Sequence, residues 1–394
     1  MISLIGFLSL PYLTRVLSPK EFGYIGIMQV ILFLVVPVFA FRAESLIGIN
    51  KAQRTEKEYL NFRNNFISFS MIITSILSFT IILFVFIVYK EFFSLFLFAL
   101  LIGICRYFIS IHNQELIQDG NATLYGKLGL LNKSLLLILT IIFLSFFEMS
   151  WEGRFLAILI VDFLFSLLRL FLFSDIVKKF YWSLDMKIIK EIVTFGGPLF
   201  LALAASWITF QSDKVIVGYF FSIDDVGFYT VSYAVGSFVN NINQSVRNVY
   251  VPKLRKDLSK NKGRTLIKKF QLYYGSFILL VAIISSVIFY KFDYYILGNE
   301  YIGTWKIIVF VSFAYAFFGI YSAYGAIFEY YKLTVLKTKI TIYGAVSNIV
   351  LSLSLIPFFG IIAPAIGTLS SFVLITFFSY KYAIIELDKR GVGN

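Results

Sequence analysis

The chain has 394 residues, of which 59% are hydrophobic and only 14% are charged, and its formal net charge is +13. Soluble domains carry roughly a quarter of charged residues, so this composition excludes an ordinary soluble domain and indicates a lipid environment. The chain has one cysteine, Cys105, and one histidine, His112, which excludes an intramolecular disulfide and argues against a zinc site or a catalytic triad.

Apolar runs long enough to cross a bilayer as helices follow one another along the whole chain. None shows the strict alternation of a barrel strand, so the sequence predicts an all-α polytopic membrane protein. The eleven full-length runs lie near residues 23–48, 65–89, 92–112, 124–147, 153–173, 193–220, 225–250, 270–290, 304–327, 339–359 and 362–382. Residues 1–16 form a shorter twelfth run, so we expect about 12 transmembrane helices.

Basic residues are distributed unevenly between the two sets of loops. Of the 35 Lys and Arg, 23 lie in the C-terminus and the loops after every second span, 6 lie in the opposite loops, and 6 lie within spans. Because basic loops stay in the cytoplasm, we expect both termini to be cytoplasmic. The basic loop VPKLRKDLSKNKGRTLIKK, which begins at Val251, fits a topology anchor near anionic lipid, so no nucleic-acid partner is expected.

A short sequence pattern occurs twice, as RVLSPKEFGYIGI and as YFFSIDDVGFYTV, with an offset of 204 residues. In both copies an apolar run ends, a serine follows, and an acidic residue stands three positions later. Ser18 with Glu21 and Ser222 with Asp225 therefore predict two capping boxes, each of which opens the next helix.

The repeat also predicts the domain organisation. Six spans separate the two copies, and an even number returns the chain to the same membrane face, so the halves should be parallel repeats. We expect six-helix lobes at residues 1–175 and 193–394, a cytoplasmic linker at 176–192, and a central cavity. The offset also leads us to expect that the first span is truncated by about a dozen residues.

Charged residues inside the predicted spans are mostly cations. A charge at mid-bilayer costs about 2.5–3.5 kcal/mol on insertion scales, so such residues usually face a cavity or a partner. The cations are Arg42, Arg106, Lys133, Arg169, Lys214 and Arg247, and the anions are Glu44, Asp162 and Asp213. This positive excess favours an anionic passenger such as a phosphate or pyrophosphate group. Snorkelling of Arg42, Arg169 and Arg247, and a structural role for Asp213 and Lys214, are the alternatives.

The predicted span at 225–250 carries a polar stripe. Tyr233, Ser237, Asn240, Gln244 and Arg247 follow steps of four and three residues, which places them on one face of a continuous helix. Such a face indicates a wet cavity, or else polar packing between helices.

The two copies of the repeat resemble a known family. The stretch PYLTRVLSPKEFGYIGI resembles the first periplasmic turn of polysaccharide repeat-unit flippases of the O-antigen type, within the multidrug/oligosaccharidyl-lipid/polysaccharide exporter superfamily. The stretch SDKVIVGYFFSIDDVGFYTVSYAVGSF looks like the turn between their seventh and eighth helices, and its Asp213–Lys214 pair matches a dipeptide typical of that helix. The resemblance covers nearly the whole chain. It implies two six-helix lobes around a cavity that opens to one membrane face at a time.

The resemblance also implies a function. We expect a flippase, not an enzyme, that moves an undecaprenyl-pyrophosphate-linked oligosaccharide of O-antigen or capsule type across the bacterial inner membrane. The expected contacts to this substrate are Arg42, Arg106, Lys133, Arg169, Lys214, Arg247, Asn240 and Gln244, and the candidates for coupling to H⁺ or Na⁺ are Asp162, Asp213 and Glu44. No metal or other cofactor is expected. The expected partners are the lipid-linked substrate, membrane lipids, a polysaccharide polymerase and a chain-length regulator.

Two alternatives are open. A cation-coupled small-molecule exporter of the same superfamily would be expected to have a more acidic cavity. A membrane polysaccharide polymerase would usually need a long outside loop with catalytic residues, and the longest here, near residues 291–303, is short.

Overall fold

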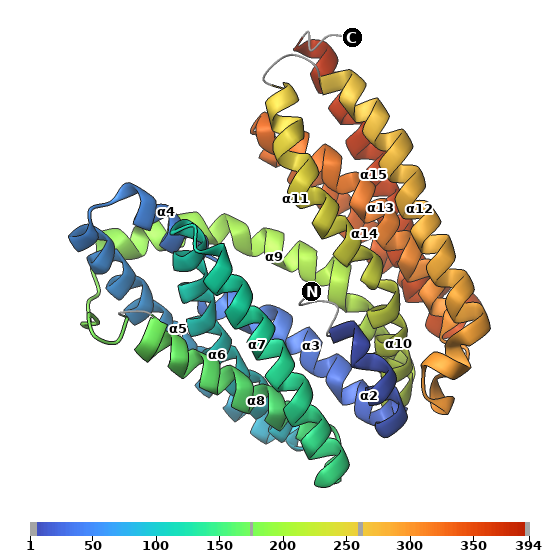
Figure 1. Ribbon diagram of the computed structural model, residues 1–394, viewed down its shortest axis with the longest axis horizontal. Coiled ribbons are helices and arrows are strands. Elements are labelled where there is room, and N and C mark those ends of the chain that lie inside the picture. The colour runs from blue at the N-terminus through green and yellow to red at the C-terminus, as the bar shows by residue number, and fades with distance from the viewer. Residues whose placement is uncertain (1–5, 174–175, 259–262, 391–394) are drawn as a thin grey trace. The chain divides into compact units, whose positions relative to one another are not determined.

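A computed structural model describes residues 6–173, 176–258 and 263–390. These residues form helices joined by short turns, with no strand among them (Figure 1). The expected all-α class is therefore confirmed.

The chain divides into two compact units. Unit 1 comprises residues 1–9 and 27–204, and unit 2 comprises residues 10–26 and 205–394. Helices α3 (Pro19–Phe39) and α9 (Met186–Phe220) each begin in one unit and end in the other. The lobe boundaries expected from the sequence, 1–175, 176–192 and 193–394, stay a prediction.

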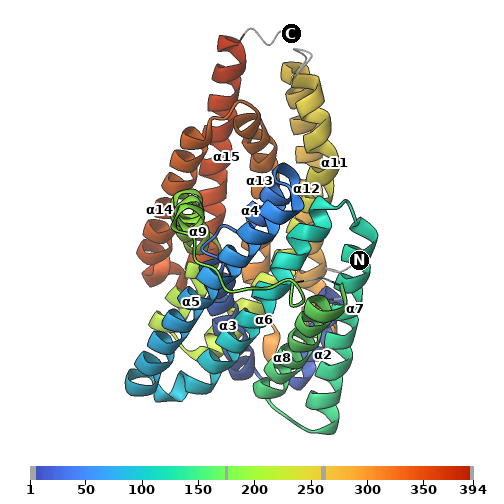
Figure 2. The ribbon, with the colours of Figure 1, turned by 90° about the vertical axis from the view of Figure 1, so that its left-hand side faces the viewer.

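In unit 1, α6 is the central helix and packs against α4, α5 and α8, while α7 packs against α8 (Figure 2). The core between α3, α4, α5 and α6 contains the fully buried side chains of Phe39, Phe62, Phe66 and Ile111. Besides the parts of α3 and α9, the unit contains α4 (Ser45–Gln53), α5 (Glu56–Val88), η1 (Lys90–Phe92), α6 (Phe93–Gln118), α7 (Ala122–Ile141), η2 (Ile142–Phe146), α8 (Trp151–Leu168) and η3 (Arg169–Phe173).

In unit 2, α13 is the central helix and packs against α10, α11, α12 and α15. Small residues on α13, including Ala314, Gly319 and Ala323, are buried, and they let neighbouring helices approach closely. The unit contains α2 (Leu10–Val16), α10 (Ile223–Gly236), α11 (Phe238–Leu258), α12 (Gly263–Ile296), η4 (Asn299–Tyr301), α13 (Trp305–Tyr330), α14 (Thr334–Phe359), η5 (Gly360–Ile362) and α15 (Ala363–Lys389).

Seven helical segments of the described residues are long and apolar enough to cross a membrane, and a bent pair, Met186–Phe200 with Leu203–Phe220, would make eight. One of the seven, Val335–Lys389, has 55 residues and contains both α14 and α15, which is length enough for two crossings. The expected span at 153–173 does not meet this test. Its helix α8 is only 18 residues long and carries Glu152, Arg154 and Asp162.

The prediction of one continuous helix over residues 225–250 is wrong. The helix breaks at Ser237, which separates α10 from α11. Gly236 before the break is a weak helix former, and a Cβ there would lie 2.7 Å from the Val311 side chain of α13. Close packing against α13 thus selects a glycine where the chain bends, and the polar stripe is divided between two helices.

The two predicted capping boxes are confirmed. The Ser18 N–H donates to the Glu21 carboxylate at 2.8 Å, and the Glu21 N–H donates to Ser18 Oγ at 3.4 Å. In the second copy, the Ser222 and Asp225 N–H groups donate to each other's side chains, both at 3.1 Å. These bonds satisfy backbone donors that the first turn of a helix leaves open.

The repeat also appears as a reciprocal contact between α3 and α10 inside unit 2. A Cβ on Gly227 would lie 1.7 Å from the Pro19 carbonyl oxygen, and a Cβ on Gly23 would lie 2.1 Å from the Ile223 carbonyl oxygen. Pro19 and Ile223, like Gly23 and Gly227, are related by the offset of 204 residues. The two helices therefore meet in a locally two-fold manner, so closely that only glycine fits at both positions.

Candidate functional site

In unit 1, three helices bring polar side chains together around Asp162. Arg106 Nε on α6 donates to Asp162 Oδ2 on α8 at 2.7 Å, and Asn132 Nδ2 on α7 donates to Asp162 Oδ1 at 3.3 Å. Asp162 is buried, whereas a third of the Arg106 side chain stays exposed. The guanidinium thus keeps free N–H donors on its accessible side.

Two more cations extend this cluster along α7 and α8. Lys133 is half-buried and lies close enough to Arg106, Asp162 and Arg154 to interact with their charges. Within the described residues, Lys133 has no hydrogen-bond or ion-pair partner. Arg154 donates to the Thr140 hydroxyl, and Thr140 lies seven residues from Lys133 on the same face of α7. We call Arg106, Lys133, Arg154 and Asp162 the cation cluster; it carries three positive charges and one negative charge.

Arg169 lies where α8 passes into η3. Its Nη1 donates to Asn113 Oδ1 on α6 at 2.6 Å and lies 3.5 Å from His112 Nδ1. The residue is only 4% exposed, so snorkelling to the membrane surface does not occur here. Arg169 and Asp162 both contact α6, as expected for two residues seven positions apart on one helix.

A second buried ion pair was missed by the sequence analysis, which counted its arginine among the loop residues. Arg63 is 1% exposed, and its Nη1 donates to Glu115 Oε1 at 3.1 Å, where the Tyr59 hydroxyl also donates at 2.6 Å. Helix α5 begins at Glu56, nine residues before the apolar run that indicated the span. Polar residues at its start therefore lie inside the helix bundle, where no apolar pattern marks them. Arg154 was likewise counted among the loop residues but lies in α8.

Arg42 and Glu44 were expected inside a span, but α3 ends at Phe39 and both residues lie in the turn before α4. Arg42 Nη1 pairs with Glu44 Oε1 at 3.2 Å, and the Arg42 side chain is largely exposed. Phe41 and Arg42 both have positive φ, 48° and 52°. The Phe41 carbonyl oxygen lies 2.2 Å from where a Cβ on Gly196 of α9 would stand, so this glycine makes room for the turn.

In unit 2, Asp213 is surrounded by neutral donors. Its Oδ2 accepts from the Tyr229 hydroxyl on α10 and from the Thr368 hydroxyl on α15, both at 2.7 Å. Asn348 of α14 donates to Thr368 at 2.8 Å and lies 3.4 Å from the Ser212 hydroxyl. The carboxylate is 1% exposed, and four helices contribute to its surroundings. A buried acid held by hydroxyl and amide groups has the chemistry of a proton or cation site.

Lys214 is also buried and lies close enough to Asp213 to interact with its charge, and it contacts other groups as well. Its Nζ donates to Gln211 Oε1 at 3.2 Å and lies 5.6 Å from the centre of the Tyr233 ring. Tyr233 accepts a hydrogen bond from the Tyr315 hydroxyl at 3.0 Å. An aromatic face and an amide oxygen therefore stabilise this ammonium group.

The remaining expected contacts lie on α11. Arg247 Nη2 is 3.7 Å from Glu329 Oε1 of α13, and Lys337 Nζ of α14 pairs with the same oxygen at 2.7 Å. Asn240 is half-buried and its Oδ1 has no hydrogen-bond partner in the described part of the chain, while Gln244 is exposed. Arg247 thus belongs to a three-residue charge cluster whose acid, Glu329, the sequence analysis did not identify.

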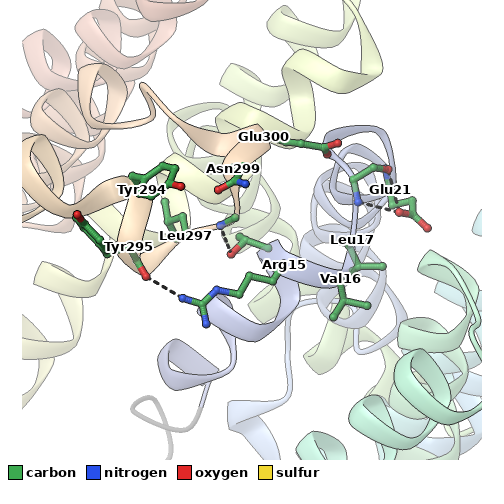
Figure 3. A pocket seen from close by; sticks show the side chains of 12 residues that line it. Arg15, Val16, Leu17, Glu21, Tyr294, Tyr295, Leu297, Asn299 and Glu300 are labelled. Carbon is green, nitrogen blue, oxygen red and sulfur yellow. Dashed lines mark hydrogen bonds between the residues drawn. The ribbon is translucent and has the colours of Figure 1, made fainter.

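Unit 2 also has a hollow of about 640 Å³ between the α2–α3 turn and η4 (Figure 3). Arg15 Nη2 donates to the Tyr295 carbonyl oxygen at 2.7 Å across it. The Tyr301 hydroxyl donates to the Leu17 carbonyl oxygen at 3.0 Å, and burial raises the pKa of Tyr301, so the hydroxyl keeps its proton. None of the contact residues expected from the sequence lines this hollow.

Comparisons with known proteins agree with this architecture. Residues 12–304 match the family described as polysaccharide biosynthesis protein. The chain is 24% identical over 305 residues to Lsg locus putative protein 1 of Haemophilus influenzae, covering 76% of this chain and 74% of that protein.

Two solved structures share the fold. One is the lipid II flippase MurJ in an inward closed conformation, with a TM-score of 0.76 and 17% identity, covering 97% of this chain and 85% of that one. The other is an inward-facing multidrug resistance MATE family transporter of the MOP superfamily, with a TM-score of 0.71 and 16% identity, covering 98% and 96%. The chain is thus a multi-pass membrane protein with the fold of these transporters.

Proposed function

Because the chain belongs to the polysaccharide biosynthesis protein family, we propose that it flips a lipid-linked oligosaccharide across the bacterial inner membrane. The substrate is a repeat unit of O-antigen or capsule type on undecaprenyl pyrophosphate. The protein opens to each membrane face in turn, and both of its termini are cytoplasmic. The fold shared with MurJ and a MATE transporter supports this alternating access.

The cation cluster of unit 1 is the observation that carries the proposal. Asp162 neutralises one of its three cations, which leaves a positive excess within apolar helices. Such an excess is costly in a membrane unless an anion shares the site. A pyrophosphate supplies several charged oxygens, which Arg and Lys bind with strong, charge-assisted hydrogen bonds. Arg42, Arg169, Lys214, Arg247, Asn240 and Gln244 are the further proposed contacts.

Asp213 is the proposed coupling residue. Its carboxylate, held by Tyr229 and Thr368, takes up a proton or Na⁺ in one state of the cycle and releases it in the other. Asp162 and Glu44 are weaker candidates for this role, because each is already paired with an arginine.

Surface polysaccharide in the bacterium that carries this gene tests the proposal. Arg106→Ala should abolish surface polysaccharide while the amount of protein in the membrane stays unchanged. Lys127→Ala, which removes an exposed cation of the same unit, is the matched control and should leave polysaccharide normal. Normal polysaccharide with a stably inserted Arg106→Ala protein would contradict the proposal.

A cation-coupled small-molecule exporter is the second candidate. The fold shared with a MATE transporter and the buried Asp213 favour it. It predicts drug resistance on expression in a sensitive host and no effect of Arg106→Ala on surface polysaccharide. The cation cluster disfavours it when the exported molecules are cations.

A further inference from the structure

The segment between α8 and α9 is tied to the first turns of α5 by a row of polar side chains. We call residues 177–190, which include the start of α9, the strap. Four hydrogen bonds hold it: Asn64 Nδ2 to the Lys179 carbonyl oxygen at 3.0 Å, the Tyr181 hydroxyl to Asn61 Oδ1 at 3.1 Å, the Ser183 N–H to Ser68 Oγ at 3.2 Å, and the Asp185 N–H to Asn65 Oδ1 at 2.5 Å. All eight residues belong to unit 1, so the strap is a built part of that unit.

The outer surface of the strap is both apolar and basic. Tyr181 and Trp182 are 49% and 56% exposed, and Met186 is 74% exposed. Its charged residues are Lys178, Lys179, Asp185, Lys187 and Lys190, all of them exposed. Tyrosine and tryptophan beside lysines are typical of segments that lie in the headgroup layer of a membrane. The four lysines give this surface a charge complementary to anionic lipid.

An apolar groove begins beside the strap. It lies between α5 and α6, has a volume of about 500 Å³, and is lined by residues that include Met71, Ile72, Ile76, Ile104, Phe108 and Trp182. Trp182 is the contribution of the strap, so the hydrogen bonds to α5 place its ring at the groove. Further along α5, Phe79, Leu83 and Phe84 are exposed, which indicates that this side of the helix faces lipid chains.

We propose that the groove and the strap together bind one anionic phospholipid of the bilayer. One acyl chain lies in the groove against Trp182, and the headgroup lies beside the lysines of the strap. Lys179 is paired with Glu56 at 2.8 Å, whereas Lys187 and Lys190 form no ion pair with another described residue. These two lysines are therefore the ones that hold the headgroup, and a zwitterionic lipid binds less well because it offers no net charge.

Quenching of Trp182 fluorescence by brominated lipid tests the proposal in the full-length protein. The four tryptophans are Trp151, Trp182, Trp207 and Trp305, so the variant W151F/W207F/W305F reports on Trp182 alone. In reconstituted vesicles, brominated phosphatidylglycerol should quench at a mole fraction about 30-fold lower than brominated phosphatidylcholine, because charged lipid gains from both lysines.

Variants separate the two halves of the site. Lys187→Gln with Lys190→Gln should remove the preference for phosphatidylglycerol, whereas Lys127→Gln with Lys381→Gln, two exposed lysines outside the strap, should keep it. Ser75→Phe, which places a ring in the groove, should weaken quenching by both brominated lipids. Equal quenching by the two lipids in the starting protein would overturn the proposal. Displacement of phosphatidylglycerol by a smaller amount of undecaprenyl phosphate would instead assign the groove to a carrier lipid.

Discussion

In unit 1 a cluster of three cations shares one carboxylate, whereas in unit 2 the Asp213 carboxylate is surrounded by hydroxyl and amide groups. Arg106, Lys133 and Arg154 gather around Asp162 on three neighbouring helices. Asp213, by contrast, accepts two hydrogen bonds at 2.7 Å from neutral side chains. The two units of the repeat thus differ: one carries a group of cations around Asp162, and the other carries a buried acid that accepts from neutral side chains.

Under the proposed function, this difference is a division of tasks between the units. A positive cluster lowers the free energy of a pyrophosphate inside the membrane, and a buried acid can change its charge state once in each cycle. The proposed transport uses both, because the passenger is bound and the direction of movement is biased.

Arg63→Ala should have the largest effect on stability. Removing one partner of a buried ion pair costs about 3–5 kcal/mol, because Glu115 would stay buried without its ion-pair partner. Lys51→Ala, which breaks a partly exposed pair with Asp119, should cost about 0–1 kcal/mol. Unfolding in mild detergent measures both. Similar costs for the two variants would show that the charges of unit 1 are more hydrated than the structure indicates.

Gly227→Ala should destabilise unit 2 by about 1–3 kcal/mol or more, because the new methyl group would overlap the Pro19 carbonyl. Gly23→Ala should destabilise unit 2 by a similar amount, because its contact with the Ile223 carbonyl is equivalent to that of Gly227 with Pro19. Gly126→Ala is the control in unit 1, where nothing lies within 4 Å of the added Cβ, and it should stabilise α7 slightly. The melting temperatures of the three variants check this order. Unequal losses of stability in Gly23→Ala and Gly227→Ala would contradict the equivalence of the two contacts between α3 and α10.

Ser222→Ala should cost about 1 kcal/mol, because it removes the N-cap of α10. Asn121→Ala removes the N-cap of α7 in unit 1, where the side chain accepts one bond from the Leu124 N–H. It should cost less, because no reciprocal bond forms there. The free energy of unfolding of both variants should be measured in the same assay. A larger loss of stability for Asn121→Ala than for Ser222→Ala would contradict this prediction.

Asp213→Asn should change stability least and energy coupling most. The amide oxygen still accepts from Tyr229 and Thr368, but it cannot take up a proton. Transport by this variant should no longer respond to collapse of the ion gradient, whereas transport by Asp162→Asn should still respond. Gradient-dependent transport by Asp213→Asn would remove this residue from the coupling step.

Much of the fold followed from local patterns in the sequence. Ser18 with Glu21 and Ser222 with Asp225 indicated both repeat turns, because a capping box needs only residues three positions apart. The buried ion pair of Arg63 could not be predicted from a local pattern of this kind. Its partner Glu115 is 52 residues away, and the helix extends beyond the apolar run that marks it. The break at Ser237 was missed for a similar reason, since it depends on how closely Gly236 packs against α13.

The sequence also identified charges without their partners. Arg106 and Asp162 were expected to face the interior, but only the folded chain shows that they pair and leave Lys133 in excess. Whether two charged side chains on different helices pair depends on how each helix is rotated about its axis and how deep it lies in the bundle. The spacing of apolar residues in the sequence defines neither.

Movement of the lipid-linked oligosaccharide in reconstituted vesicles is the direct test of the proposed flipping and of the role of the cation cluster. An enzyme that cleaves sugars and is kept outside the vesicles would report how much substrate reaches the outer leaflet. Wild-type protein and Lys127→Ala should expose more substrate than protein-free vesicles do, and Arg106→Ala should expose no more than protein-free vesicles do. Equal exposure above the protein-free level with Arg106→Ala and wild-type protein would contradict the role of the cation cluster. Exposure with wild-type protein that does not exceed the level in protein-free vesicles would contradict the proposed flipping itself.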